Sequence, residues 1–253
     1  MPIGFYYIHL RHNNKIMHKK TEDICTLAYN FQQKALKNHP EYFVSNISRF
    51  VPSITIAPRT YIVAEQEGDC LGSLYKVYYK SRGEKHLMEM DSPVLSVPFT
   101  PNGIMEAWLL GNLTDFFPKD WHAQYTNKYF LFYEDIHTKL FASNTIDFYV
   151  PERDLKEHRV EFFGGEEGLK NALSSALKDT RTGWCDAFDT YAPDYILPSI
   201  TIVADRALMT YCYWNYWTGL VRCTINIVKN GDGIKVTDKS SEILVEYQVP
   251  LFF

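Results

Sequence analysis

The 253-residue sequence predicts an α+β fold built from two copies of one strand-rich unit. The first observation is a repeated segment, because Val51-Pro-Ser-Ile-Thr-Ile56 returns as Leu197-Pro-Ser-Ile-Thr-Ile202. The second is a helical pattern upstream of each copy, and the third is a pair of turn signals downstream. Together they predict a tandem duplication with antiparallel sheets, helices packed on one face of the sheets, and both copies packed into one body.

Each repeated segment follows a helical pattern with the same apolar stripe. Its residues fall at i, i+3, i+4 and i+7, a spacing that places them on one face of a helix. They are Ile24, Leu27, Ala28 and Phe31 in the first copy, and Leu169, Ala172, Leu173 and Ala176 in the second. We therefore expect helices over residues 21–38 and 167–179.

Strand patterns surround both helices in the same order. The offset between matched residues rises from 143 (Ile3 with Ile146) to 152 (Val97 with Val249), so the matches are collinear. The turn signals Ser81-Arg-Gly83 and Asn230-Gly-Asp-Gly233 separate the later strands and favour antiparallel hairpins. Each unit is β-β-α-β-β-β. The expected strands are 3–10, 14–19, 53–65, 71–80 and 86–99, then 145–151, 158–163, 198–216, 219–229 and 233–249.

This pattern divides the chain into three parts: a first repeat over 1–100, a connector over 101–144 and a second repeat over 145–253. The connector carries one helix with an apolar stripe and a hairpin-like stretch over 128–141. The stripe consists of Met105, Leu109, Leu113 and Phe116. A segment this apolar does not behave as a flexible linker, so we expect the connector to pack between the copies.

Composition narrows the class of protein. The net charge of −4 opposes nucleic-acid binding, which requires an excess of lysine and arginine. The N-terminus lacks the basic region of a signal peptide, and no apolar run is long enough to span a membrane. Five scattered cysteines without a CxxC pair indicate reduced thiols rather than a zinc site. We expect a cytoplasmic protein with no cofactor, and the oligomeric state stays open.

The two copies differ most after the repeated segment. The first copy continues as Ala64-Glu-Gln-Glu-Gly-Asp-Cys-Leu-Gly72, which reads as a polar hairpin turn, whereas the second continues with an aromatic run. Aromatic residues on both faces of one strand are typical of a recognition surface, or of a strand buried on both sides. The predicted binding residues are Tyr211, Tyr213, Trp214, Tyr216 and Trp217.

A metal site is the second possibility. His9 and His12 lie on opposite faces of a regular strand, so they do not chelate one ion together. The paired units resemble the vicinal-oxygen-chelate family, which implies His and Glu ligands on the first and a late strand of each module. The matching positions are His9, Glu152 and Glu246, with Glu89 as a further late-strand candidate.

The C-terminal segment Glu246-Tyr-Gln-Val-Pro-Leu251 is similar to the closing strand of small-molecule-binding domains of the GyrI type. That resemblance implies a ligand held between duplicated α+β units. The sequence contains no G-x-S-x-G motif and no P-loop, which argues against an enzyme. We expect a non-catalytic cytosolic protein that binds a partner protein through the aromatic strand, as inhibitor or immunity-type proteins do. The alternative is a small-molecule-binding protein or a metal-dependent enzyme with its site in the cleft between the repeats.

Overall fold

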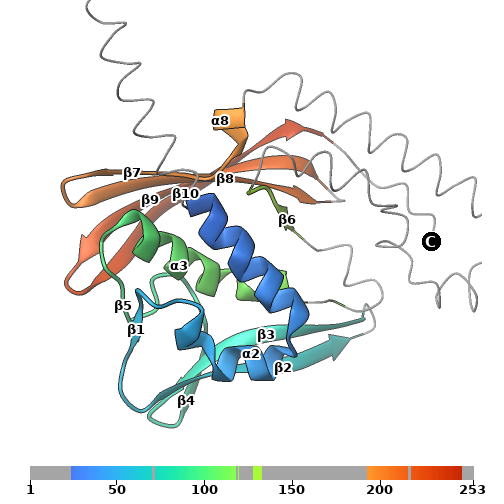
Figure 1. The fold of residues 1–253 in the computed structure, drawn as a ribbon, viewed down its shortest axis with the longest axis vertical. Helices are drawn as coiled ribbons and strands as arrows, with labels where there is room; N and C mark the ends of the chain where they lie inside the picture. The colour runs from blue at the N-terminus through green and yellow to red at the C-terminus, as the bar shows by residue number, and fades with distance from the viewer. Residues whose placement is uncertain are drawn as a thin grey trace, which may run out of the picture.

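The structure is a computed structural model that describes residues 24–69, 72–117, 119, 128–132, 193–215 and 218–246. These residues form short and medium helices and three antiparallel sheets (Figure 1). The α+β class and the antiparallel pairing are therefore confirmed. No helix in the described part of the chain is both long and apolar enough to cross a membrane.

The smaller of the two main sheets is a three-stranded meander. Its strands are β2 (Thr60–Asp69), β3 (Gly72–Ser81) and β4 (Glu84–Leu87). The turn between β3 and β4 has positive φ at both Arg82 (53°) and Gly83 (84°), which suits a tight hairpin between right-twisted strands. Beside this sheet, β1 (Thr55–Ile56) pairs with β5 (Leu95–Ser96).

The larger sheet has β8 (Arg206–Asn215) at its centre. On one side β8 pairs with β9 (Gly219–Asn230), which in turn pairs with β10 (Gly233–Val245). On the other side β8 pairs with β7 (Ser199–Val203) at its start and with β6 (Tyr129–Phe130) at its end. Strand β10 contains two register shifts, which bend this long strand at the edge of the sheet.

The first described helix spans residues 24–37. It is followed by α2 (Pro40–Ser45), η1 (Ile47–Arg49), α3 (Pro101–Gly111), η2 (Leu113–Phe116) and α8 (Pro193–Ile196). Helix α3 begins where Thr100 accepts a hydrogen bond from the Gly103 N–H through its side chain, with Pro101 in the first turn. Both residues are typical of a helix start.

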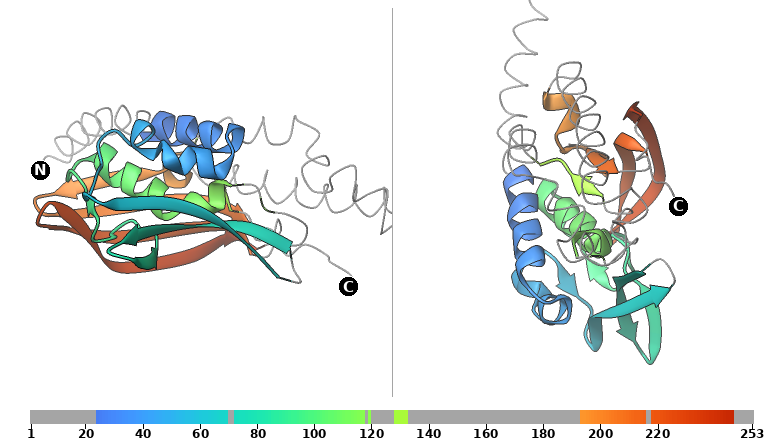
Figure 2. Two further views of the ribbon diagram at one scale, coloured as in Figure 1. Left: turned by 90° about the horizontal axis from the view of Figure 1, so that it is seen from below. Right: turned by 90° about the vertical axis from the view of Figure 1, so that its right-hand side faces the viewer.

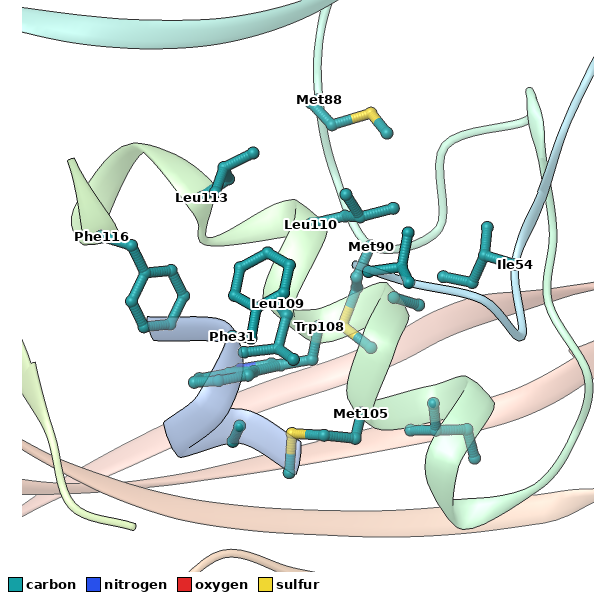
Figure 3. Close-up of a cluster of buried hydrophobic side chains, with 14 of the residues drawn as sticks. Phe31, Ile54, Met88, Met90, Met105, Trp108, Leu109, Leu110, Leu113 and Phe116 are labelled. Atoms are coloured by element: carbon teal, nitrogen blue, oxygen red, sulfur yellow. The ribbon is translucent and has the colours of Figure 1, made fainter. Parts of the chain in front are cut away.

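Helix α3 is buried on all sides, because every residue from Gly103 to Leu110 is buried. It lies between the 24–37 helix and strands β8–β10 (Figure 2), and the Trp108 ring packs 4.7 Å from that of Tyr211. Side chains from the 24–37 helix, the loops beside β1 and β5, and η2 meet around it (Figure 3). One continuous apolar core therefore joins both main sheets through α3.

A buried carboxylate joins α3 to the first Pro-Ser-Ile-Thr-Ile segment. Glu106 accepts hydrogen bonds from the Ser53 N–H (2.7 Å) and the Ser53 hydroxyl (2.8 Å). Burial raises the pKa of Glu106, although hydrogen bonds from Ser53 and Ile54 oppose that shift. In the second Pro-Ser-Ile-Thr-Ile segment, Ser199 instead shares a hydrogen bond with Thr210, 2.8 Å between the hydroxyl oxygens.

Several predicted boundaries are wrong, and the reasons are local. The expected strands 53–65 and 198–216 are each two strands, because Arg59 (φ 60°) and Ala204 (φ 54°) turn the chain between them. The expected strand 86–99 is replaced by the end of β4, a loop and β5. Residues 64–69 continue β2 and are not a turn, because lysines on neighbouring strands pair with Glu65 and Glu67.

Other differences concern the helices and the connector. The connector helix ends at Gly111, and its last two stripe residues, Leu113 and Phe116, lie in the separate 3-10 turn η2. Helices α2 and α8 were not predicted, although each begins with a proline, a residue typical of the first helical turn. The expected strands 3–10, 14–19, 145–151 and 158–163, and the helix 167–179, lie outside the described residues.

Candidate functional site: the end of strand β8

Strand β8 carries the first part of the aromatic run, and its inner face turns toward α3. Tyr211 lies on this face with only 3% of its surface exposed. Its ring contacts those of Trp108 and Phe130, with centroids 4.7 and 6.0 Å away. Burial raises the pKa of the Tyr211 hydroxyl, and the neighbouring Cys223 adds to this shift. Tyr211 is therefore a core residue and offers no surface to a partner.

The outer face of β8 is covered as well. Cys212, next along the strand, is 1% exposed, and Leu220 on β9 is fully buried. Burial raises the pKa of the Cys212 thiol to about 12, and burial also raises that of Cys223. A thiol attacks as the thiolate, so neither cysteine is suited to nucleophilic catalysis near neutral pH.

Tyr213 marks the point where the inner face of β8 leaves the core. Its side chain is half-buried, packs against Phe130 with ring centroids 6.1 Å apart, and lies below the Lys128 ammonium, 5.7 Å from the ring centroid. Burial raises the pKa of Tyr213 to about 12, with smaller contributions from Cys223 and Asp115. Tyr213 is thus a neutral phenol beside a lysine, an arrangement that stabilises the cation through the ring.

A charged cluster borders this tyrosine. Asp115, on η2, forms ion pairs with the Nζ atoms of Lys119 (3.0 Å) and Lys128 (2.8 Å). The Lys119 side chain is 4% exposed and that of Lys128 is 35% exposed. One aspartate therefore holds two lysines, and the more exposed of them reaches over Tyr213.

Strand β10 extends the same face of the sheet. The register aligns Tyr213 with Val221 on β9 and Val221 with Ile243 on β10. Ile243 is 55% exposed, whereas Val221 is buried. Lys239 lies on this face, four residues before Ile243, is exposed, and has no ion pair within the described part of the chain. We call Tyr213, Lys128, Lys239 and Ile243 the β8–β10 patch.

The opposite face of β10 has its own charge pairing. Glu242 accepts a hydrogen bond from the Tyr195 hydroxyl (2.8 Å) and lies 3.4 Å from the Arg222 guanidinium. That guanidinium stacks 3.8 Å from the centre of the Tyr195 ring. Glu242 is therefore engaged on the outer face and does not neutralise the lysines of the β8–β10 patch.

The predicted site residues have different outcomes. Tyr211 and Tyr213 lie together on the inner face of β8, whereas the backbone of Trp214 pairs with Tyr129 and Leu220. The side chain of Trp214, and the whole of Tyr216 and Trp217, lie outside the described residues.

The metal-site candidates are not brought together. His9 and Glu152 lie outside the described residues, while Glu246 follows β10 and Glu89 precedes β5, both exposed. Within the ranges that the structure describes, no three His, Cys, Asp or Glu side chains group as a metal site requires.

Sequence reasoning missed Asp115, Lys119, Lys128 and Lys239. The spacing of Asp115 and Lys119 at i and i+4 was an available signal, but nothing local indicates the contact between Lys128 and Tyr213. Comparisons with protein-family models, with curated proteins and with solved structures find no match for this chain.

Proposed function

We propose that this chain is a non-catalytic binding protein that recognises a partner protein through residues 213–217, as inhibitor or immunity-type proteins do. The observation that carries this proposal is the change along β8. Tyr211 and Cys212 are buried on the two faces of the strand, whereas Tyr213 is only half-buried and is separated by Val221 from the exposed Ile243. Aromatic residues beyond the point where the core is complete favour recognition.

Two further observations favour a protein partner over the alternative of a ligand or metal in a cleft between the repeats. Buried side chains of α3, including Met105 and Trp108, fill the space between the two main sheets. The β8–β10 patch is also spread over three strands, which suits a broad contact more than an enclosed pocket.

We also propose that the two main sheets descend from a tandem duplication, with repeats over 1–100 and 145–253 and a connector over 101–144. In support, each repeated segment precedes a residue of positive φ, a ten-residue strand and an antiparallel meander. In support of a cytoplasmic location, Cys212 and Cys223 are buried and form no disulfide within the described residues.

The test is capture of a partner from the native cells by the wild-type protein and by two variants, Trp214→Ala and Trp217→Ala. The proposal expects a specific partner that is lost in both variants while thermal unfolding stays cooperative. Tyr61→Ala is the matched control, because Tyr61 is a 70% exposed aromatic on the other main sheet. Equal capture by all four proteins would refute the proposal. Loss of folding in both tryptophan variants would assign these residues to the core.

A further inference from the structure

The charges around Tyr213 define which kind of partner the β8–β10 patch accepts. We infer that the partner presents an acidic segment with an apolar side chain, whose carboxylates contact Lys128 and Lys239 while its apolar group covers Tyr213 and Ile243. This inference rests on the proposed function and specifies the chemistry of the same surface.

The first step is the local excess of positive charge. Lys128 and Lys239 belong to the patch, and Asp115, which pairs with Lys128, also pairs with Lys119. Lys128 lies over the Tyr213 ring, and the register of β8, β9 and β10 places Lys239 on the same face of the sheet as Tyr213. This excess contrasts with the net charge of −4 for the whole chain.

The second step is that the two outer lysines are available. Lys128 keeps 35% of its side chain exposed although it contacts Asp115, and Lys239 is exposed. The acids of β10 beside these positions, Asp238 and Glu242, lie on the opposite face, where Asp238 accepts a hydrogen bond from Asn226 and Glu242 pairs with Arg222. A carboxylate from outside the chain can therefore approach both lysines without displacing an existing ion pair.

The third step is the apolar strip between the two lysines. Ile243 is more than half exposed beside the buried Val221, and Tyr213 is half-buried on the other side. Covering the exposed part of Ile243 and Tyr213 adds a hydrophobic contribution, while the lysines fix the orientation of the partner and raise its association rate. The combination selects an acidic segment that carries apolar residues over a purely acidic one.

The probes are two fluorescein-labelled twelve-residue peptides, three repeats of Glu-Leu-Glu-Ser and three repeats of Lys-Leu-Lys-Ser. Binding to the full-length protein is measured by fluorescence anisotropy at low and moderate NaCl. We expect the acidic peptide to bind and the basic peptide not to bind. The affinity of the acidic peptide should fall as the NaCl concentration rises. Lys239→Glu, which breaks no ion pair among the described residues, should weaken binding by about tenfold, and Lys128→Glu should do the same.

Lys235→Glu is the control, because Lys235 is exposed on β10 but the register places it on the opposite face of the sheet. This variant should bind the acidic peptide with the same affinity as the wild type. Binding that is unchanged in both lysine variants, stronger binding of the basic peptide, or no binding of either peptide overturns the acidic-partner inference. These results do not depend on capture of the native partner. Lysine-dependent peptide binding that persists in Trp214→Ala and Trp217→Ala would keep the charge inference and refute the aromatic one.

Discussion

The hairpins β2–β3 and β8–β9 both begin with a ten-residue strand, yet their outer faces use opposite means of stabilisation. On β2, Glu65 and Glu67 point outward and pair with Lys76, Lys80 and Lys85. On β8, Cys212 occupies the position that matches Glu65 when Arg59 is aligned with Arg206, and it is buried. The outer face of the β2–β3 hairpin is therefore in contact with solvent, whereas the β8–β9 hairpin lies in the middle of the larger sheet.

This difference shows why a strand at the middle of a sheet accepts aromatic residues on the face that packs against a helix. Strand β8 has neighbours on both edges and α3 on its inner face, so Tyr211 gains contact with Trp108 and Phe130. Among the described strands, β2 pairs with β3 alone, and charged cross-strand pairs suit a sheet that faces water. The Pro-Ser-Ile-Thr-Ile segment is thus followed by a solvated edge strand in one case and by a buried central strand in the other.

The largest expected effect comes from removing the buried aromatic of β8. Tyr211→Ala leaves a cavity beside Trp108 and should lower the free energy of unfolding by about 3–5 kcal/mol. Tyr61→Ala on β2 should change it by less than about 0.5 kcal/mol, because that ring is exposed. Urea unfolding followed by circular dichroism measures both, and similar losses would show that the two hairpins do not differ as described.

A smaller effect separates the two Pro-Ser-Ile-Thr-Ile segments. Glu106→Ala leaves the half-buried Ser53 N–H without its acceptor, which should cost about 1–3 kcal/mol of unfolding free energy. Glu106→Gln keeps the geometry, since its amide oxygen can accept from the Ser53 N–H and its amide nitrogen can donate to the Ser53 hydroxyl. It should therefore be at least as stable as the wild type at neutral pH.

The pH dependence follows from the same carboxylate. Because burial raises the pKa of Glu106 in the folded state, protonation favours folding. Its stabilising contribution is complete below the usual pKa near 4.5 and is lost as pH rises through the elevated value. Urea titrations from pH 4 to pH 8 should show this decline in the wild type and not in Glu106→Gln. A decline of equal size in both proteins would assign it to other groups.

Cysteine reactivity gives a smaller but residue-specific comparison. With the pKa of Cys212 raised to about 12 and that of Cys223 also raised, both thiols should resist iodoacetamide at pH 8 in the folded protein. Both should react after unfolding in guanidinium. Peptide mapping by mass spectrometry distinguishes the sites, and rapid labelling of Cys212 in the folded state would show that the outer face of β8 is open.

The smallest effect belongs to the charged face of β2–β3. The hydrogen bonds from Lys80 and Lys85 lower the pKa of Glu65, yet 34% of this side chain is exposed and its pairs are screened by salt. Glu65→Gln should melt within experimental error of the wild type, in low and in high NaCl. A large loss on mutation would mean that β2 depends on its charges as β8 depends on its aromatics.

The sequence predicted the elements whose signals are local. The apolar stripe beginning at Ile24 predicted the first helix, and the Asn230-Gly-Asp-Gly233 turn predicted the β9–β10 hairpin. The breaks at Arg59 and Ala204 were missed because neither residue is typical of positive φ. The complete burial of α3 was missed because its stripe reads as one-sided, whereas two sheets and another helix enclose it.

The candidate site was predicted only in part for the same reason. An aromatic run can be read from the sequence, but the division between the core residue Tyr211 and the half-buried Tyr213 depends on where α3 ends beneath β8. The two lysines of the β8–β10 patch lie next to β6 and on β10, two regions that are distant in the chain. No spacing rule relates Lys239 to Lys128, so this part of the surface required the fold.

The most direct test of the account is solvent exposure at the end of β8. All tryptophans can be replaced with 5-fluorotryptophan, and the fluorine resonances assigned with single Trp→Phe variants. A gadolinium chelate in solution should then broaden the resonance of Trp217, or of Trp214, much more than that of the fully buried Trp108. If both resonances are as protected as that of Trp108, residues 213–217 belong to the core and the proposed recognition surface does not exist.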